Sequence, residues 1–137
     1  MDMTEFNKKI IEEFRANAGI VGGQFAGAPM LLLTTTGAKS GRSHTTPLVH
    51  SKDGDQIVVI ASKAGAPTNP AWYHNLKAHP TVSLEVGTQR FEAKAVVTSG
   101  DERERLFNAQ AKQMAAFDEY RKKTTRVIPV IKLHKVG

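Results

Sequence analysis

The stretch LLLTTTGAKSGRSHTTPL, Leu31 to Leu48, decides the fold that we expect for this chain. Two apolar and β-branched runs, typical of strands, flank a connection that contains two glycines, Lys39, Arg42, two serines and no acid. A plain hairpin needs only a short turn such as Asn-Gly. The segment therefore predicts two antiparallel strands joined by a loop that is suited to an anion.

Similar patterns on either side extend this hairpin into a larger antiparallel sheet. Helical spacing of apolar residues predicts helices over 4–18, 71–78 and 100 to about 120. Alternating or continuous apolar runs predict about six strands, at 30–36, 45–51, 56–62, 81–86, 89–98 and 127–133. Strands and helices do not alternate, so we do not expect a parallel doubly wound sheet. The prediction is an α+β fold, mainly antiparallel, with the sheet curled into a small barrel and helices outside.

The length of 137 residues predicts one domain spanning 1–137. Within it, residues 1–29 are expected to form an N-terminal helix followed by a flexible, glycine-rich linker. The start of the chain shows no signal peptide, and no apolar run reaches the length of a membrane span. We therefore expect a cytoplasmic protein, with peripheral attachment to the inner face of the cell membrane as an open alternative.

The charge balance points to an anionic partner. The formal net charge is +6. Six basic residues and no acid lie between Arg121 and the end of the chain, namely Arg121, Lys122, Lys123, Arg126, Lys132 and Lys135. Such an excess suits an anionic small molecule, a nucleic acid or a lipid surface, or it simply keeps the protein soluble.

Residues for protein-based catalysis are not evident. The chain has no cysteine, which excludes disulfides and thiol catalysis. The five histidines do not form a metal-ligand pattern, and there is no Gly-x-Ser-x-Gly elbow. If the protein is an enzyme, we expect a bound cofactor rather than a metal or a nucleophile to carry the reaction.

Two segments are candidates for binding such a cofactor. In the loop after Thr36, Lys39, Arg42 and backbone N–H groups could hold a phosphate, although a solvated hairpin explains the loop equally well. Further along, Asn69 suits a helix N-cap, and Trp72 and Tyr73 follow at the start of that helix. The two aromatic side chains suit either a flat ring or the core.

Three segments together resemble the deazaflavin (coenzyme F420)-dependent nitroreductase family of actinobacteria. They are LLLTTTGAKSGRSHTTPL, ASKAGAPTNPAWYHNLKAHP and RVIPVIKL, in this order, and the similarity runs from about Met30 to Leu133. The resemblance implies an FMN-binding-like split β-barrel that binds coenzyme F420, an 8-hydroxy-5-deazaflavin.

The resemblance also implies where the cofactor and the substrate bind. Residues for the phosphate and the glutamate tail are Ala38, Lys39, Ser40, Arg42 and His44. His44 stands where the family commonly has arginine. Residues around the deazaflavin are Thr45, Thr46, Pro47, Leu48, Ile60, Ala61, Ser62, Lys63, Ala71, Trp72, Tyr73 and Asn75. Substrate-facing candidates are Ser62, Met114, Phe117 and Tyr120.

The resulting hypothesis is an oxidoreductase that transfers a hydride from reduced deazaflavin to a planar, electron-poor acceptor. By resemblance the acceptor is a quinone, an activated enone or a nitroaromatic, and Ser62 or Tyr120 hydrogen-bonds its oxygen. One alternative is an FMN-binding enzyme of the pyridoxamine-phosphate-oxidase-like type. A remote alternative is a module for anionic lipid or nucleic acid, although we expect no nucleic-acid partner. A monomer and a homodimer are both compatible with the sequence.

Overall fold

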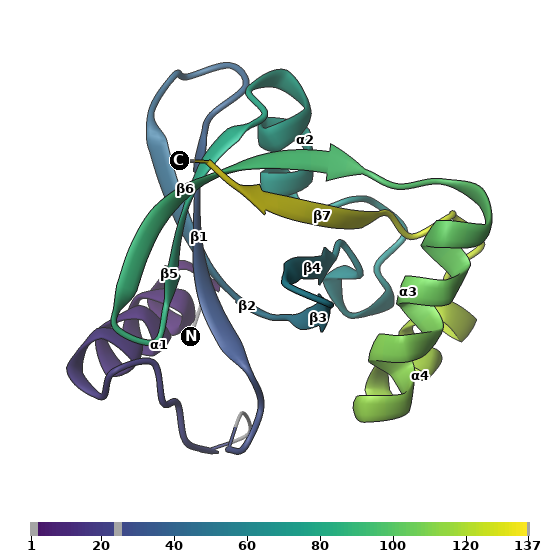
Figure 1. The fold of residues 1–137 in the computed structure, drawn as a ribbon, viewed down its shortest axis with the longest axis horizontal. Helices are drawn as coiled ribbons and strands as arrows, with labels where there is room; N and C mark the ends of the chain where they lie inside the picture. The colour runs from purple at the N-terminus through teal and green to yellow at the C-terminus, as the bar shows by residue number, and fades with distance from the viewer. Residues whose placement is uncertain (1–2, 24–25, 137) are drawn as a thin grey trace.

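The computed structural model describes residues 3–23 and 26–136, and it contains a curled antiparallel sheet with helices around it (Figure 1). The helices are α1 (Met3–Ala16), η2 (Lys63–Gly65), α2 (Ala71–Ala78), α3 (Gly100–Gln113) and α4 (Ala116–Lys123). The strands are β1 (Met30–Thr36), β2 (Ser43–Val49), β3 (Ser51–Asp53), β4 (Gln56–Ile60), β5 (Thr81–Val86), β6 (Gln89–Val97) and β7 (Val130–Lys135). Residues 24 and 25 of the predicted linker lie outside the described residues.

The sheet closes on itself at His50. The strand order is β2-β1-β5-β6-β7-β4-β3, so the two edge strands β2 and β3 are separated in the chain by His50 alone. The backbone N–H of His50 donates to the carbonyl of Pro29 at 2.9 Å, which extends the β1–β2 pairing by one residue beyond Met30 and Val49. The predicted single strand over 45–51 is therefore wrong: it bends into two strands that lie at opposite edges. This bend turns a seven-stranded sheet into a barrel and confirms the predicted fold class.

Strand β1 is buried on both faces. Leu31 and Leu33 point into the barrel, where they join a core cluster with Trp72 and Leu76 of α2. Their neighbours Met30 and Leu32 pack on the opposite face against Phe14 of α1 and Val21. Successive strand residues face opposite sides, so an uninterrupted apolar run is what a doubly covered strand requires. Strand β1 thus packs α2 against its barrel face and α1 against its outer face.

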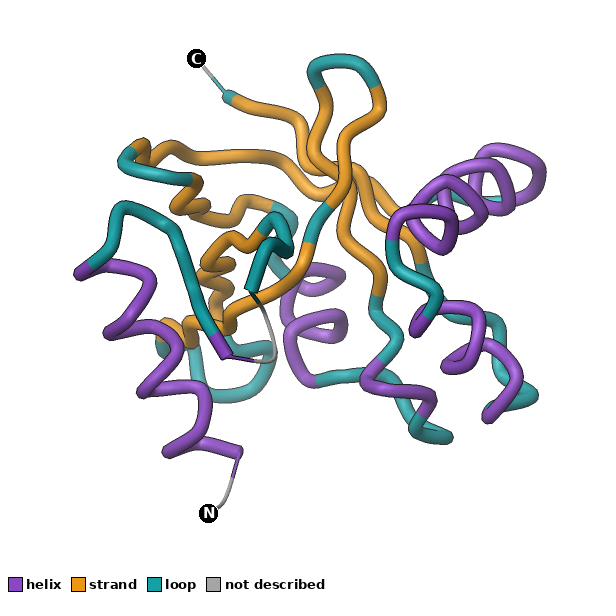
Figure 2. The backbone as a smooth tube through the Cα atoms, turned by 90° about the horizontal axis from the view of Figure 1, so that it is seen from below, coloured by secondary structure: helices purple, strands orange, loops and turns teal. Residues whose placement is uncertain are grey.

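Strand β4 is covered on both faces in the same way. Ile57 and Val59 join the cluster inside the barrel. Val58 and Ile60 pack outward against a second cluster, whose largest members are Phe107 of α3 and Phe117 of α4. Figures 1 and 2 show the result, with α1 at one end of the molecule and the α3–α4 pair at the other.

The predicted helix from residue 100 to about 120 is also wrong, because it is two helices. The chain leaves helical geometry at Met114, and α4 turns back beside α3. This turn places the Arg121 guanidinium 4.6 Å from the centre of the Phe107 ring and lets it bond Asn108 at 3.1 Å. Neither glycine nor proline marks the break, so the sequence carried no signal for it.

We expect the unfolding free energy to fall as the pH drops below about 6.5, because His50 must stay neutral in the barrel. Burial, assisted by the charge of Lys52, lowers the pKa of the His50 imidazole below its ordinary value. The unfolded chain then binds a proton that the folded chain excludes, so stability is full above the unfolded pKa and is lost as the pH falls. Denaturant unfolding at several pH values between about 5 and 8 measures this slope.

His50→Gln should flatten the slope, whereas the same change at the exposed His79 should leave it unaltered. Equal slopes for the wild type and His50→Gln would show that another group governs the acid sensitivity.

Candidate functional site

The loop between β1 and β2 folds on its own hydrogen bonds. The N–H of Gly37 donates to the carbonyl of Arg42 at 2.7 Å, and the N–H of Gly41 donates to the carbonyl of Gly37 at 3.0 Å. The N–H of Arg42 donates to Ser40 Oγ at 3.1 Å. Within the part of the chain that the structure describes, the N–H groups of Lys39 and Ser40 have no partner. Two free donors next to a lysine are what an anion binds.

Glycine at position 37 leaves room for the side chains of Ser40 and His44 in their present positions. A Cβ there would overlap Ser40 Oγ and would lie 2.9 Å from Nε2 of His44. The Ser40 hydroxyl and the His44 ring approach each other at 3.4 Å across this space. Gly41 has a positive φ of 71°, which lets the loop reverse at its tip. The two glycines of the predicted loop therefore serve different purposes.

Asn75 ties the loop to the barrel. Its Oδ1 accepts a hydrogen bond from the N–H of Ala38 at 3.0 Å, and its Nδ2 donates to Thr35 Oγ1 at 3.1 Å. Asn75 lies on α2, whose Trp72 and Leu76 are buried in the core. Because α2 is packed against the core, it moves little, and its hydrogen bond to Ala38 holds the loop in a fixed position.

A pocket of about 1090 Å³, here called the loop pocket, lies beside this loop. Lys8 of α1 and Lys39 of the loop both line it, and among the described residues that line it none is acidic. The side chain of Trp72 adds a buried aromatic surface to it. The complete lining is Asn7, Lys8, Ile11, Gly37, Ala38, Lys39, Ser40, Ser43, His44, Thr45, Thr46, Ala71, Trp72, His74 and Asn75.

Nine residues predicted from the sequence meet in the loop pocket: Ala38, Lys39, Ser40, His44, Thr45, Thr46, Ala71, Trp72 and Asn75. Four others do not line it. Arg42 is exposed on the loop, and Pro47 and Leu48 are half-buried further along β2. Tyr73 is buried in the barrel interior and does not line the pocket, which favours the core explanation for this aromatic side chain.

The other predicted residues of the cofactor site form a second group at the end of β4. Ile60, Ala61 and Ser62 are buried there. Lys63 follows with a positive φ of 48°, a conformation that costs a non-glycine residue on the order of 1 kcal/mol or more. Its Nζ donates to Thr68 Oγ1 at 3.3 Å. Backbone strain of this kind is common where a loop must be held in one shape for binding.

Arg126 holds this second group in place, a role that the sequence did not reveal. Its guanidinium donates to the carbonyls of Ala66 and Ser62 at 2.9 and 2.8 Å and to Asn69 Oδ1 at 2.7 Å. Burial lowers the pKa of Arg126 from its ordinary value, yet arginine stays charged. Asn69 is therefore not the helix cap that was predicted. Pro70 occupies the N-cap position, and the Asn69 side-chain oxygen accepts a hydrogen bond from Arg126.

The predicted substrate-facing residues lie near the second group. Met114 is at the break between α3 and α4, and the rings of Phe117 and Tyr120 meet edge to face with centroids 5.5 Å apart. Helix α4 contacts η2, where a Cβ on Gly65 would come within 2.9 Å of the Tyr120 carbonyl. The structure thus brings Tyr120 close to the turn that carries Lys63, away from the loop pocket.

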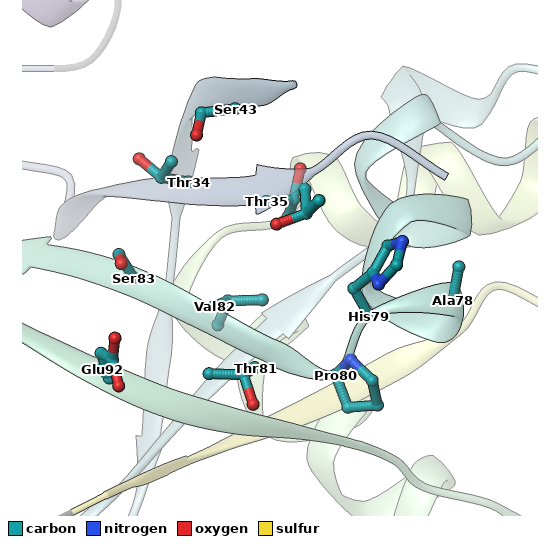
Figure 3. A pocket seen from close by; sticks show the side chains of 11 residues that line it. Thr34, Thr35, Ser43, Ala78, His79, Pro80, Thr81, Val82, Ser83 and Glu92 are labelled. Carbon is teal, nitrogen blue, oxygen red and sulfur yellow. The ribbon is translucent and has the colours of Figure 1, made fainter. Parts of the chain in front are cut away.

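Figure 3 shows a second hollow, of about 460 Å³, bordered by β1, β5 and the end of α2. Thr34, Ser83 and Glu92 face one another there from three neighbouring strands. Its lining contains several hydroxyl groups and one carboxylate but no lysine or arginine. An anion therefore fits the loop pocket better than this hollow.

Four basic residues of the C-terminal region have internal partners among the described residues. Lys132 bonds Glu102 at 2.8 Å and Asp53 at 3.1 Å, and Arg121 bonds Asp118 at 2.7 Å. Lys122 reaches Glu119 at 3.5 Å, and Lys135 lies 5.1 Å from the centre of the Phe91 ring. These internal partners weaken the alternative of a module for nucleic acid or anionic lipid.

Comparison with known proteins identifies close relatives. A family model described as F420H(2)-dependent quinone reductase matches residues 7–135. The F420H(2)-dependent quinone reductase Rv1261c of Mycobacterium tuberculosis strain H37Rv is 42% identical over 124 residues, which are 88% of this chain and 83% of that protein.

Solved structures agree with this similarity. An F420-H2 dependent reductase, FDR-A, is 38% identical with a TM-score of 0.71 and covers 77% of this chain and 94% of its own. A structure described as a domain-swapped dimer is 33% identical, with a TM-score of 0.74 over 97% of this chain and 100% of its own. A FAD-binding protein from Mesorhizobium loti, 11% identical with a TM-score of 0.55 over 100% of this chain and 90% of its own, shares the fold alone.

Asn75→Ala should release the loop from α2. The change removes the partners of the Ala38 N–H and the Thr35 hydroxyl, and we expect a loss of about 1–3 kcal/mol in the free energy of unfolding. Hydrogen exchange of the Ala38 amide should accelerate more than that of the core strands. Asn108→Ala, which removes one exposed bond to Arg121, is the control. Unchanged exchange at Ala38 would refute the anchoring role of Asn75.

Proposed function

Since the chain belongs to the F420H(2)-dependent quinone reductase family, we propose that it oxidises reduced coenzyme F420 and reduces a quinone. The observation that carries this proposal is the loop pocket. Lys39 and Ser40, whose N–H groups have no partner among the described residues, line it together with Lys8, and none of its described lining residues is acidic. The loop belongs to the segment Leu31 to Leu48, which is one of the three segments that resemble the deazaflavin-dependent family.

The residues present suit the charged end of such a cofactor. The N–H groups of Lys39 and Ser40 and the Lys39 ammonium would hold its phosphate. Thr45 and Thr46 offer hydroxyl groups along the same wall, and His44 adds charge only when it is protonated. Arg42 does not line the pocket, so within the proposed site it acts at longer range than Lys39.

We place the flat ring system between the two groups of residues. The start of α2 connects them, because Trp72 lines the loop pocket while Asn69, just before the helix, is bonded to Arg126. Ile60, Ala61, Ser62 and Lys63 would then border the ring, and Met114, Phe117 and Tyr120 would face the acceptor. Arg126 would act as a positioning residue for this border.

When bound, the reduced deazaflavin supplies a hydride from its C5 carbon, which together with one proton converts a quinone into a hydroquinone. The protein's contribution is to hold the two partners in contact and to exclude other orientations, an effect that can lower a barrier by roughly 7–11 kcal/mol in favourable cases. The hydroxyl of Tyr120 or Ser62 would donate to the quinone oxygen as negative charge develops on it.

The partners proposed for the protein are small molecules. Among the described residues, no helix is long and apolar enough to cross a bilayer. Peripheral attachment to a membrane surface through α1 or the C-terminal residues, and a choice between monomer and homodimer, stay predictions. Size-exclusion chromatography and vesicle sedimentation test them directly.

The direct test of the function mixes the protein with reduced F420 and the naphthoquinone menadione and follows oxidation of the cofactor. We expect protein-dependent oxidation with one hydroquinone formed per cofactor oxidised. Titration with FMN is the parallel measurement for the alternative cofactor. Tight 1:1 binding of FMN together with no binding of F420 would overturn the proposal.

Lys39→Ala should weaken F420 binding by about 1.5–3 kcal/mol, or about ten- to a hundred-fold, because a charge-assisted hydrogen bond to the phosphate is lost. Quenching of cofactor fluorescence measures the affinity. Lys112→Ala, an exposed lysine on α3, removes the same charge at the other end of the molecule and should have little effect. An unchanged affinity for Lys39→Ala would exclude this lysine as a phosphate ligand.

Tyr120→Phe should reduce kcat/KM for menadione by at least about ten-fold and leave F420 affinity unaltered, since only the bond to the developing charge is lost. The chain has one other tyrosine, the buried Tyr73, and Tyr73→Phe is therefore the matched control. If the two variants show the same kinetics, Tyr120 does not contact the acceptor.

A further inference from the structure

Helix α1 forms a wall of the loop pocket, although it precedes the loop by some twenty residues and nothing in the sequence connected the two. Asn7, Lys8 and Ile11 line the pocket together with the residues of the loop and of α2. We propose that α1 is part of the cofactor site and that Lys8 is a specificity-determining residue for the anionic tail of the cofactor. This inference rests on the proposed function and adds a second cationic wall to the site.

The position of α1 is fixed independently of Lys8. Phe14 is only 1% exposed in the core cluster beneath the helix. Arg15 forms two hydrogen bonds with Glu85 of β5, at 3.0 and 2.9 Å, and Glu13 accepts one from the N–H of Gly22 at 2.8 Å. All three contacts lie in the C-terminal half of the helix. The N-terminal half is therefore held over the pocket without any contribution from Lys8.

Helix geometry separates Lys8 from its neighbour Lys9. Lys8 lies three residues before Ile11, so the two side chains are about 60° apart around the axis of α1, and both line the pocket. Lys9 is rotated about 100° around the helix axis and does not line the pocket. The side chains of Lys8 and Lys9 are both exposed, so the two lysines differ in the direction in which they leave the helix and not in how deeply they are buried.

The charge of Lys8 is available to a ligand. Within residues 3–23 and 26–136, neither Lys8 nor Lys39 forms an ion pair and no carboxylate lines the pocket that they share. The two ammonium groups lie on different elements, so an extended polyanion can contact both, whereas a single phosphate at the loop needs only Lys39. The tail of the cofactor carries its phosphate and glutamate carboxylates, and the ring part carries neither. Lys8 should therefore favour the tailed cofactor over a tail-less deazaflavin.

The test compares the affinity of two probes, F420 and its tail-less 8-hydroxy-5-deazaflavin riboside analogue, by fluorescence titration at low and at moderate salt. Lys8→Ala should weaken F420 binding about two- to five-fold, the effect expected for one exposed ion pair, and Lys8→Glu should weaken it further. Neither change should alter the affinity for the tail-less analogue. The difference between wild type and Lys8→Ala should shrink as salt is added.

Lys9→Ala is the matched control, because it removes the same charge from the same helix and should leave both affinities unchanged. If Lys8→Ala and Lys9→Ala weaken F420 equally, or if the tail-less analogue is weakened as much as F420, the inference is overturned while the proposed function stands. If the wild-type protein binds neither probe, the proposed function and this inference both fall.

Discussion

The burial of β1 on both of its faces is the constraint on which the rest of the molecule depends. Leu31 and Leu33 need apolar partners inside the barrel, and α2 supplies them; Met30 and Leu32 need partners outside, and α1 supplies them. Each such side chain contributes roughly 1.5–3 kcal/mol when it is removed from water. The loop after β1 emerges between these two helices, and so the packing of one strand determines what surrounds the anion-binding loop.

Helix α2 transmits this packing to both halves of the site. Its Asn75 fixes the loop through Ala38, and the residue before its cap, Asn69, meets Arg126. Trp72 lies between these contacts, at the boundary of the core and the loop pocket. A helix that is immobilised in a core can hold two distant loops at a constant separation, which an elongated cofactor requires.

The distribution of ion pairs distinguishes charged residues that hold the fold together from charged residues that are available to a ligand. Asp53 accepts hydrogen bonds from Arg105 and Lys132, which lower the pKa of its carboxyl group to about 2 and link β3 to α3 and β7. In the C-terminal region, Arg121, Lys122 and Lys132 are paired with acids in this manner, which leaves the net charge of the chain unchanged but gives half of the six basic residues an acidic partner. In contrast, the lysines of the loop pocket have no such partner among the described residues.

The sequence by itself determined most of the strands, the α+β barrel class and the loop that suits an anion, because apolar periodicity, turn residues and the run from Leu31 to Leu48 are local signals. Three structural features depended on tertiary structure: the bend at His50, the break between α3 and α4 at Met114, and the three hydrogen bonds that Arg126 donates to the segment before α2. Each depends on partners far away in the chain, such as Pro29 for His50 and Phe107 for the helix that returns after Met114. The position of α1 depends on distant partners for the same reason. Its amphipathic pattern predicted that one face is covered, but only the packing of Phe14 against β1 placed Lys8 at the loop pocket.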